Sequence, residues 1–291
     1  MAQNVVTVQP PFSLVRWIRQ YPVAALVVLV FLFEWIVMVP TVASETGRLP
    51  FRIPLAVQLT LGWMPGLAAI IVTGAVSGRA GIRALLRRYL IWRVNIGWYL
   101  LAIFGTGFFI LGGIAIHLLL GGTMPALALT ENAPVASIVS FVVLLLFGVL
   151  LNTEDMAWRG VALPRMQARQ GALVASLNMS VLFAATHLPY FFVPGDFRQQ
   201  TGIWFFVFTA ALTILMTWMY NNTRGSLLMV VLFHAATNAW SNLADTNPPP
   251  GPNDLTPFLW AVALMWALAI AAIVISGPKR LSRKPESEMP T

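Results

Sequence analysis

The residues best suited to chemistry lie in one short stretch, with Glu154, Asp155 and Arg159 directly after an apolar run. Charged side chains are costly inside a membrane, so those found there are usually paired or functional. On a continuous helix Asp155 and Arg159 stand four residues apart and can form an ion pair. Glu154 lies about 100° around that helix from Asp155 and is left free to react. The alternative interpretation is an ordinary helix end with interfacial charges.

Two further pairs of residues place polar side chains on single helix faces. Phe183 and His187 are four residues apart, and so are His234 and Asn238. On helices, an aromatic ring would shield the face that shows one imidazole, and an amide would lie beside the other imidazole. Each histidine alone is more simply explained by a hydrogen bond between packed helices. Together with Glu154, the two pairs predict a polar pocket inside a helix bundle.

Such a pocket contains the groups that peptide hydrolysis requires. A buried carboxylate can take a proton from a water molecule that a histidine shares. An amide or a protonated imidazole can stabilise the oxyanion that forms when water attacks a carbonyl. The cofactor stays open between a zinc ion and none, because Glu154, His187 and His234 also form a plausible catalytic zinc set.

The composition places this pocket in a membrane. Of 291 residues, 58% are hydrophobic and only 10% are charged, whereas roughly 25% charged residues is typical of soluble domains. The net charge of +8 comes mainly from arginines beside apolar runs, which favours membrane lipids and not nucleic acid as partners. The chain has no cysteine, which excludes disulfides and a thiolate nucleophile. We predict a single integral membrane domain over residues 1–291.

The apolar runs predict the elements that position the pocket. Their lengths match the roughly 20 residues that a bilayer core requires, so we predict an all-α, polytopic membrane helix bundle of about eight transmembrane helices. Glu34 in the first run is interpreted as a structural partner for an arginine or as a polar helix contact. Gly62, Pro65 and Gly66 in the second run predict close packing or a kink. The runs are 23–39, 55–76, 97–120, 135–157, 172–192, 202–220, 226–240 and 258–275.

The basic residues predict the orientation. The arginine-rich segment 79–93 is predicted to form an amphipathic helix at the membrane surface. Lysines and arginines gather on one side of the predicted spans, so the positive-inside rule places both termini in the cytoplasm, in a plasma or inner membrane. Residues 276–291 then form a cytoplasmic basic tail. The first apolar run is expected to be a retained helix and not a cleaved signal.

One residue fits this topology poorly, because His187 comes late in its run while Glu154 lies near the cytoplasmic end of its own. Either the fifth helix starts deeper in the membrane than Ala172, or it is tilted or broken near Pro189. We expect the former, with an interfacial segment up to about Ala172.

These motifs resemble those of the CAAX-protease and bacteriocin-processing (CPBP, or ABI) intramembrane proteases, which include type II CAAX prenyl endopeptidases. Glu-Asp-Met-Ala-Trp-Arg-Gly at 154–160 resembles the family's Glu-Glu-x-x-x-Arg motif. Phe-Ala-Ala-Thr-His at 183–187 matches Phe-x-x-x-His, and His-Ala-Ala-Thr-Asn at 234–238 matches His-x-x-x-Asn. The order and spacing suit the family, and we predict a catalytic core over residues 135–240.

The resemblance implies an intramembrane endopeptidase with eight helices and a catalytic cavity open to the cytoplasm. Its substrate would be a prenylated protein with a CAAX-like tail, or a leader peptide. Glu154 and His187 would activate water, and His234 and Asn238 would stabilise the oxyanion. The family has been described both as metalloproteases and as metal-independent glutamate proteases, so the resemblance leaves zinc open.

One position departs from the family, because Asp155 replaces its second glutamate. The effect of this replacement on activity should be mild if Asp155 only supports Arg159. Activity is in doubt if Asp155 touches substrate or metal. Motifs of the other intramembrane proteases (His-Glu-x-x-His, Gly-x-Gly-Asp, or Gly-x-Ser-x-Gly with a partnering histidine) are absent from the sequence. Two alternatives without proteolysis are an immunity or scaffold protein of the same fold, and a proton-coupled transporter that uses Glu34, Glu154 and the histidines.

Overall fold

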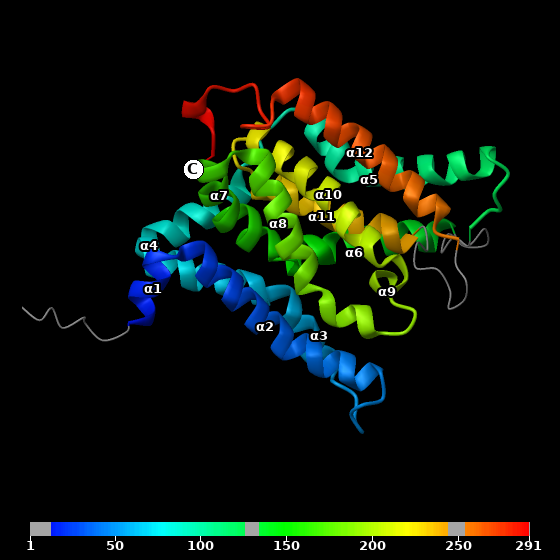
Figure 1. Ribbon diagram of the computed structural model, residues 1–291, viewed down its shortest axis with the longest axis horizontal. Coiled ribbons are helices and arrows are strands. Elements are labelled where there is room, and N and C mark those ends of the chain that lie inside the picture. The colour runs from blue at the N-terminus through cyan, green and yellow to red at the C-terminus, as the bar shows by residue number, and fades with distance from the viewer. Residues whose placement is uncertain (1–12, 126–133, 244–253, 291) are drawn as a thin grey trace, which may run out of the picture.

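The computed structural model describes residues 13–125, 134–243 and 254–290, and these residues form helices and no strands (Figure 1). The all-α bundle predicted from the apolar runs is therefore confirmed. The α-helices are α1 (Leu14–Gln20), α2 (Pro22–Glu45), α3 (Leu55–Leu59), α4 (Met64–Arg87), α5 (Ile96–Leu119), α6 (Pro134–Leu151), α7 (Leu163–Gln170), α8 (Ala172–Thr186), α9 (Phe197–Thr201), α10 (Ile203–Asn222), α11 (Leu227–Leu243) and α12 (Thr256–Ser276). Short 3₁₀ turns and one π-helix connect some of them: η1 (Thr60–Trp63), η2 (Arg88–Leu90), the π-helix η3 (Met156–Ala162), η4 (Leu188–Phe192) and η5 (Glu286–Glu288).

The long helices are apolar enough to place the chain in a membrane. Within the described ranges, five helical segments are long and apolar enough to cross it: α2, residues 55–90, α5, α10 and α12. Helix α6 and residues 156–170 make a sixth candidate if they count as one span, although they meet at a bend of 45°. Helices α8 and α11 are apolar but shorter, with 15 and 17 residues. The chain is thus an integral membrane protein, and eight crossings are not confirmed.

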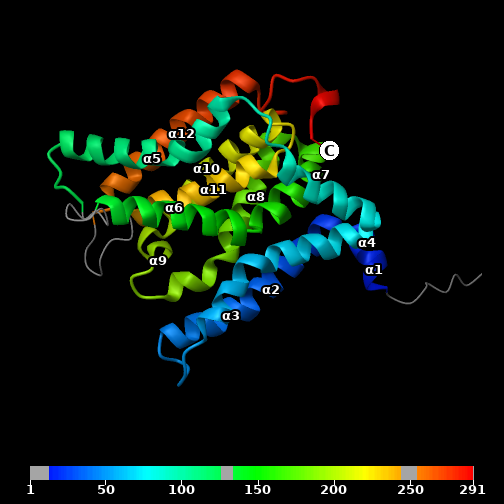
Figure 2. The same ribbon diagram turned by 180° about the vertical axis from the view of Figure 1, so that it is seen from behind.

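The helices pack so that the motif-bearing segments lie in the middle of the bundle. Helix α11 packs against α5 and α6, α10 against α8 and α12, and α2 against α4. Both views show α1, α4, α7 and the C-terminal segment at one end of the bundle and α9 at the other (Figures 1 and 2).

Helix α2 is longer than its apolar run predicts. The predicted run ended at residue 39, before Pro40, but the helix continues through this proline to Glu45. The Thr41 hydroxyl donates a hydrogen bond to the Val37 carbonyl at 2.9 Å. Helices buried in protein or membrane tolerate proline where such side chains and neighbouring helices satisfy the backbone.

Helix α6 ends earlier than predicted, at Leu151 instead of about Ala157, because Thr153 bonds to another helix. Its backbone N–H and its hydroxyl both donate to the Gly62 carbonyl, at 3.0 and 2.7 Å. Its Oγ1 also accepts the Gly66 N–H at 2.8 Å, which caps the start of α4. The chain then turns into a new helix that carries Glu154 and Asp155.

Gly66 supplies the close approach that this junction needs. A Cβ at Gly66 would come within 2.6 Å of Thr153 Oγ1, whereas a Cβ at Gly74 of the same helix would meet only the end of the Ile82 side chain, at 3.3 Å. We predict that Gly66→Ala lowers the free energy of unfolding by about 1–3 kcal/mol, measured by denaturant titration in detergent. Gly74→Ala is the matched control and is expected to be neutral or stabilising. Equal effects of the two substitutions would contradict the packing argument.

Helix α8 begins at Ala172 and ends at Thr186, and Leu188–Phe192 follow as a 3₁₀ turn. The predicted run to Phe192 is therefore too long, because Pro189 cannot continue the helix and disfavours helical geometry before it. The break near Pro189, and not the deeper start that we expected, accounts for the late position of His187.

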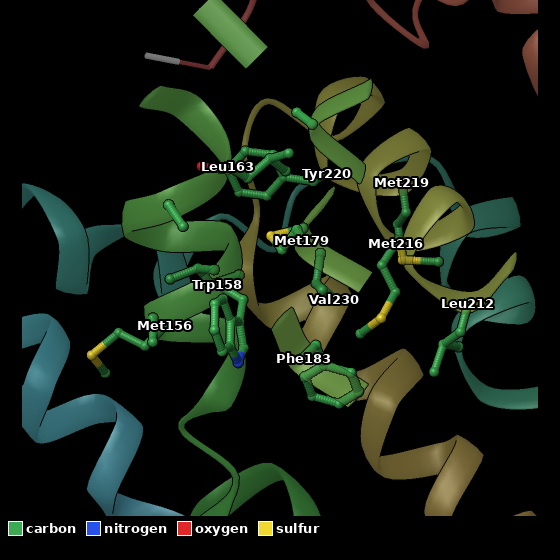
Figure 3. Packing of buried hydrophobic residues seen from close by; sticks show 14 of the residues in the cluster. Met156, Trp158, Leu163, Met179, Phe183, Leu212, Met216, Met219, Tyr220 and Val230 are labelled. Carbon is green, nitrogen blue, oxygen red and sulfur yellow. The ribbon is translucent and has the colours of Figure 1, made fainter. Parts of the chain in front are cut away.

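A buried cluster fixes the helices behind the motifs. Trp158 of the π-helix packs edge-on against Phe183 of α8, with ring centroids 6.5 Å apart. Figure 3 shows both rings in one cluster with Met179 of α8 and Met216 of α10. Trp158, Met179 and Met216 are almost fully excluded from solvent. This packing holds two motif-bearing segments, the π-helix and α8, against α10.

Candidate active site

The structure brings Glu154 between two imidazole rings. Its Oε1 lies 4.0 Å from His187 Nε2, and its Oε2 lies 3.6 Å from His234 Nε2. The three residues come from the start of the helix after α6, the C-terminal cap of α8 and the middle of α11. The Glu154 side chain keeps 18% of its surface exposed. The predicted convergence of these three side chains is therefore observed, with the carboxylate within reach of a water molecule shared with either histidine.

The ring of His187 is fixed at its other nitrogen. Nδ1 lies 3.1 Å from the Phe183 carbonyl oxygen and 3.1 Å from Thr186 Oγ1. The carbonyl can only accept, so Nδ1 carries the proton and donates it. The neutral ring then presents the lone pair of Nε2 towards Glu154.

His234 is held in the same sense by a carboxylate. Its Nδ1 lies 3.1 Å from Asp155 Oδ2 and 3.1 Å from the amide nitrogen of Asn152. Since the carboxylate can only accept, Nδ1 donates to Asp155. An imidazole whose Nδ1–H is held by a carboxylate is well suited to carry a second proton on Nε2. Adjacent carboxylates thus contact the two nitrogens of one ring.

Asp155 also forms the predicted ion pair with Arg159. Arg159 donates from a terminal nitrogen to Asp155 Oδ1 at 2.9 Å, and both side chains are completely buried. A second terminal nitrogen donates to Thr213 Oγ1 of α10 at 3.3 Å. The aspartate in place of the family's second glutamate is therefore long enough to reach both Arg159 and His234. It supports more than the arginine.

Phe183 packs against all the cationic or aromatic members of the site. Its ring centroid lies 5.1 Å from that of His187 and 5.9 Å from that of His234. The Arg159 guanidinium lies over the ring, 5.7 Å from its centroid. Phe183 thus shields the imidazole of His187, as expected, and it also packs against that of His234.

Asn238 is the predicted site residue that the structure does not join to the others. It follows His234 by one turn of α11 and is exposed. Its amide makes no hydrogen bond with the side chains of Glu154, His187 or His234. Its role in oxyanion stabilisation stays a prediction.

Asn152 is a site residue that the motif analysis did not identify. Its Oδ1 accepts the backbone N–H of Glu154 at 2.9 Å, while its amide nitrogen contacts His234. The sequence does contain a signal for this role, because asparagine is favoured just before a helix. We predicted one continuous helix through Asn152 because an apolar run precedes it.

Replacing Asn152 with alanine is expected to lower the free energy of unfolding by about 1 kcal/mol, the usual contribution of a helix cap. The Glu154 backbone would lose its acceptor, so the catalytic rate should fall as well. Thermal unfolding and peptide cleavage, measured on the same preparation, check both effects. Asn242→Ala is the control, because Asn242 is exposed and bonds only within α11. An unchanged unfolding midpoint would rule out the cap.

Glu34 lies near the site, but not as the partner of an arginine. It is 2% exposed, and among the described residues no arginine forms an ion pair with it. Its carboxyl lies beside Thr186 and interacts electrostatically with Glu154, while Oε2 has no hydrogen-bond partner in the described part of the chain. Its neighbour Trp35 donates to the Thr186 carbonyl at 2.8 Å. Helix α2 thereby supports the α8 terminus that carries His187.

The predicted zinc set is not arranged as a metal site. The described residues contain no group of three or more His, Asp or Glu side chains placed to hold a metal ion. Nδ1 of each histidine is bonded within the protein, which leaves Nε2 of each ring facing Glu154; histidines that bind metals are commonly held in the same way. The reaction proposed below is written with the protein's own side chains, and chelation tests it.

Comparison with known proteins supports the motif resemblance. The family model of Rce1-like type II CAAX prenyl endopeptidases matches residues 134–240, which contain all three motifs. A CAAX prenyl protease 2 from Methanococcus maripaludis is 28% identical over 103 residues, which is 33% of this chain and 38% of that protein. The similarity to type II CAAX prenyl endopeptidases is thus confirmed over this segment, and the chain matches well under half of the length of this relative.

Proposed function

We propose that the chain is an intramembrane endopeptidase that hydrolyses a peptide bond at the cytoplasmic face of the membrane. Its substrate is a prenylated protein with a CAAX-like tail, or a leader peptide. The observation that carries the proposal is the partly exposed Glu154 carboxylate between the Nε2 atoms of His187 and His234. The family match over residues 134–240 supports it.

In the proposed reaction Glu154 is the general base. A water molecule between Glu154 and His187 donates one hydrogen bond to the carboxylate and one to the Nε2 lone pair. The water oxygen attacks the scissile carbonyl carbon while its proton passes to Glu154. The fixed Nδ1 of His187 keeps the ring in the accepting tautomer, so both acceptors are oriented before the substrate binds.

The oxyanion is stabilised from α11. His234, protonated on both nitrogens, donates from Nε2, and Asn238 donates from its amide once the substrate is in place. Asp155 holds the proton on Nδ1 of His234, and Arg159 holds Asp155. When the carbon–nitrogen bond breaks, the leaving amine takes the proton from Glu154. The second proton of the water stays on the attacking oxygen, so the products are a free amine and a carboxylic acid, which releases that proton to the solvent.

The test is cleavage by the purified full chain in lipid nanodiscs. Substrates are a farnesylated CAAX peptide, the same peptide without the prenyl group, and a leader-peptide reporter, each with and without a strong chelator. We expect cleavage that survives chelation and is lost with Glu154→Ala. Loss on chelation, restored by zinc, would overturn the metal-independent mechanism. Failure to cleave any of the substrates would favour an immunity or scaffold role.

A further inference from the structure

A cavity lies away from Glu154, at the end of the bundle where α4, α7 and the C-terminal segment meet (Figures 1 and 2). Its volume is about 930 Å³, which is in the range of ligand-binding cavities. Its walls are α4, Arg88 of η2, Gly160 of the π-helix, α7, the first turn of α8, and residues 278–280, 289 and 290. The proposed peptidase reaction uses none of these lining residues.

The cavity is lined by cations and by no acid among the residues described. The basic lining residues are Arg88, Arg165, Arg169, Lys279 and Arg280. Arg88 and Arg165 are close enough to repel one another. Arg165, Arg169, Lys279 and Arg280 form no ion pair with a described carboxylate. Arg165 and Arg280 are partly buried, while Arg169 and Lys279 are exposed at the mouth of the cavity. Like charges gathered in one cavity repel one another and favour a bound anion.

The C-terminal segment is a fixed wall of this cavity. The backbone N–H groups of Ala172 and Leu173, at the start of α8, donate to the carbonyls of Lys279 and Pro278 at 2.8 and 3.0 Å. The Asn221 amide donates to the Arg280 carbonyl at 2.7 Å. These bonds hold the backbone of Lys279 and Arg280 in place at the wall of the cavity.

The remaining lining is apolar and reaches the helix that follows Glu154. Leu85, Pro164, Leu173 and Val174 contribute apolar side chains, and Gly160 of the π-helix forms part of the wall. A ligand that satisfies both parts has an anionic head and an apolar stem. Basic pockets between transmembrane helices at a membrane surface are suited to phospholipid head groups.

We propose that this cavity binds the phosphate head group of an anionic phospholipid, with Arg165, Arg169, Lys279 and Arg280 around the phosphate. The acyl chains leave along the apolar wall between α4 and α8. An occupant would contact the π-helix that carries Arg159.

The test is lipid retention by the full chain, measured by native mass spectrometry from detergent with added phosphatidylglycerol or phosphatidylcholine. Arg165→Gln with Arg169→Gln, and Lys279→Gln with Arg280→Gln, should each weaken phosphatidylglycerol binding by about tenfold or more, as expected when two charge-assisted contacts are lost. Phosphatidylcholine should bind weakly to every variant. Arg79→Gln with Arg83→Gln is the matched control, because these exposed arginines of α4 carry the same charge but do not line the cavity.

Equal phosphatidylglycerol binding by the control and by both cavity variants would overturn the site. Because the Arg165 and Arg169 variant changes α7 itself, the tail variant provides a separate measurement, and thermal unfolding identifies misfolded preparations. Soluble glycerol phosphate distinguishes the two sources of a phosphate group. If it raises the unfolding temperature as much as the intact lipid does, the assignment to a lipid is wrong.

Discussion

Glutamine in place of Glu154 is expected to slow peptide hydrolysis by about 10²- to 10⁴-fold, the usual contribution of a general base. The substitution keeps the shape of the side chain and removes only its ability to accept a proton. Glu154 is the carboxylate that faces Nε2 of both histidines, whereas Asp155 is fully buried and already bonded to Arg159 and His234. Initial rates on the substrate that the wild type cleaves fastest measure the effect.

Glu45→Gln is the control for this substitution. Glu45 is an exposed carboxylate at the end of α2, and we expect its loss to leave cleavage unchanged. Thermal unfolding of both variants should stay near that of the wild type. Wild-type rates in Glu154→Gln would show that another group activates the water.

Breaking the ion pair between Asp155 and Arg159 is expected to have the largest effect on stability. Arg159→Met leaves the Asp155 carboxylate buried without its partner, since both side chains have no exposed surface. Removing one member of a buried pair typically costs about 3–5 kcal/mol. The unfolding midpoint in a denaturing-detergent titration should therefore fall sharply.

The double variant Asp155→Asn with Arg159→Met separates stability from chemistry. It buries no unpaired charge, so we expect it to recover most of the stability that Arg159→Met loses. It should nevertheless cleave slowly, because an amide in place of Asp155 no longer stabilises a protonated His234. Recovery of wild-type cleavage together with stability would contradict the role assigned to Asp155.

Local spacing predicted much of the site. Asp155 and Arg159 pair because residues four apart share a helix face, and this holds even though the segment is a π-helix and not a regular α-helix. The convergence of Glu154, His187 and His234 followed from placing the polar faces of three predicted helices together. The inference is reliable because placing a charged or strongly polar side chain in lipid costs free energy, so these side chains seldom face lipid.

Features that depend on contacts between distant segments were not predictable in the same way. The end of α6 is set by the bonds of Thr153 to Gly62 and Gly66, and nothing within the apolar run indicates it. His187 is the C-terminal cap of α8 because Pro189 follows it. The proline is a local signal for this break, whereas we expected the helix to start deeper in the membrane. Pro40 gave the opposite error, since α2 continues through it.

The contacts of the C-terminal segment were likewise not predictable from the sequence. Its basic residues were visible in the sequence and predicted a tail. The structure instead packs residues 278–281 against α8 and α10 through backbone carbonyls. Backbone hydrogen bonds require no particular side chain, so they leave no pattern in the sequence.

A single turnover in water labelled with oxygen-18, with enzyme in excess over a farnesylated CAAX peptide, tests the central claim most directly. If Glu154 activates water for direct attack on the carbonyl, mass spectrometry will find one labelled oxygen in the new carboxylate of the first product formed. A first product without the label, with the label on Glu154, would mean covalent attack by the carboxylate and would contradict the mechanism. The absence of any cleaved product would contradict hydrolysis of this substrate class.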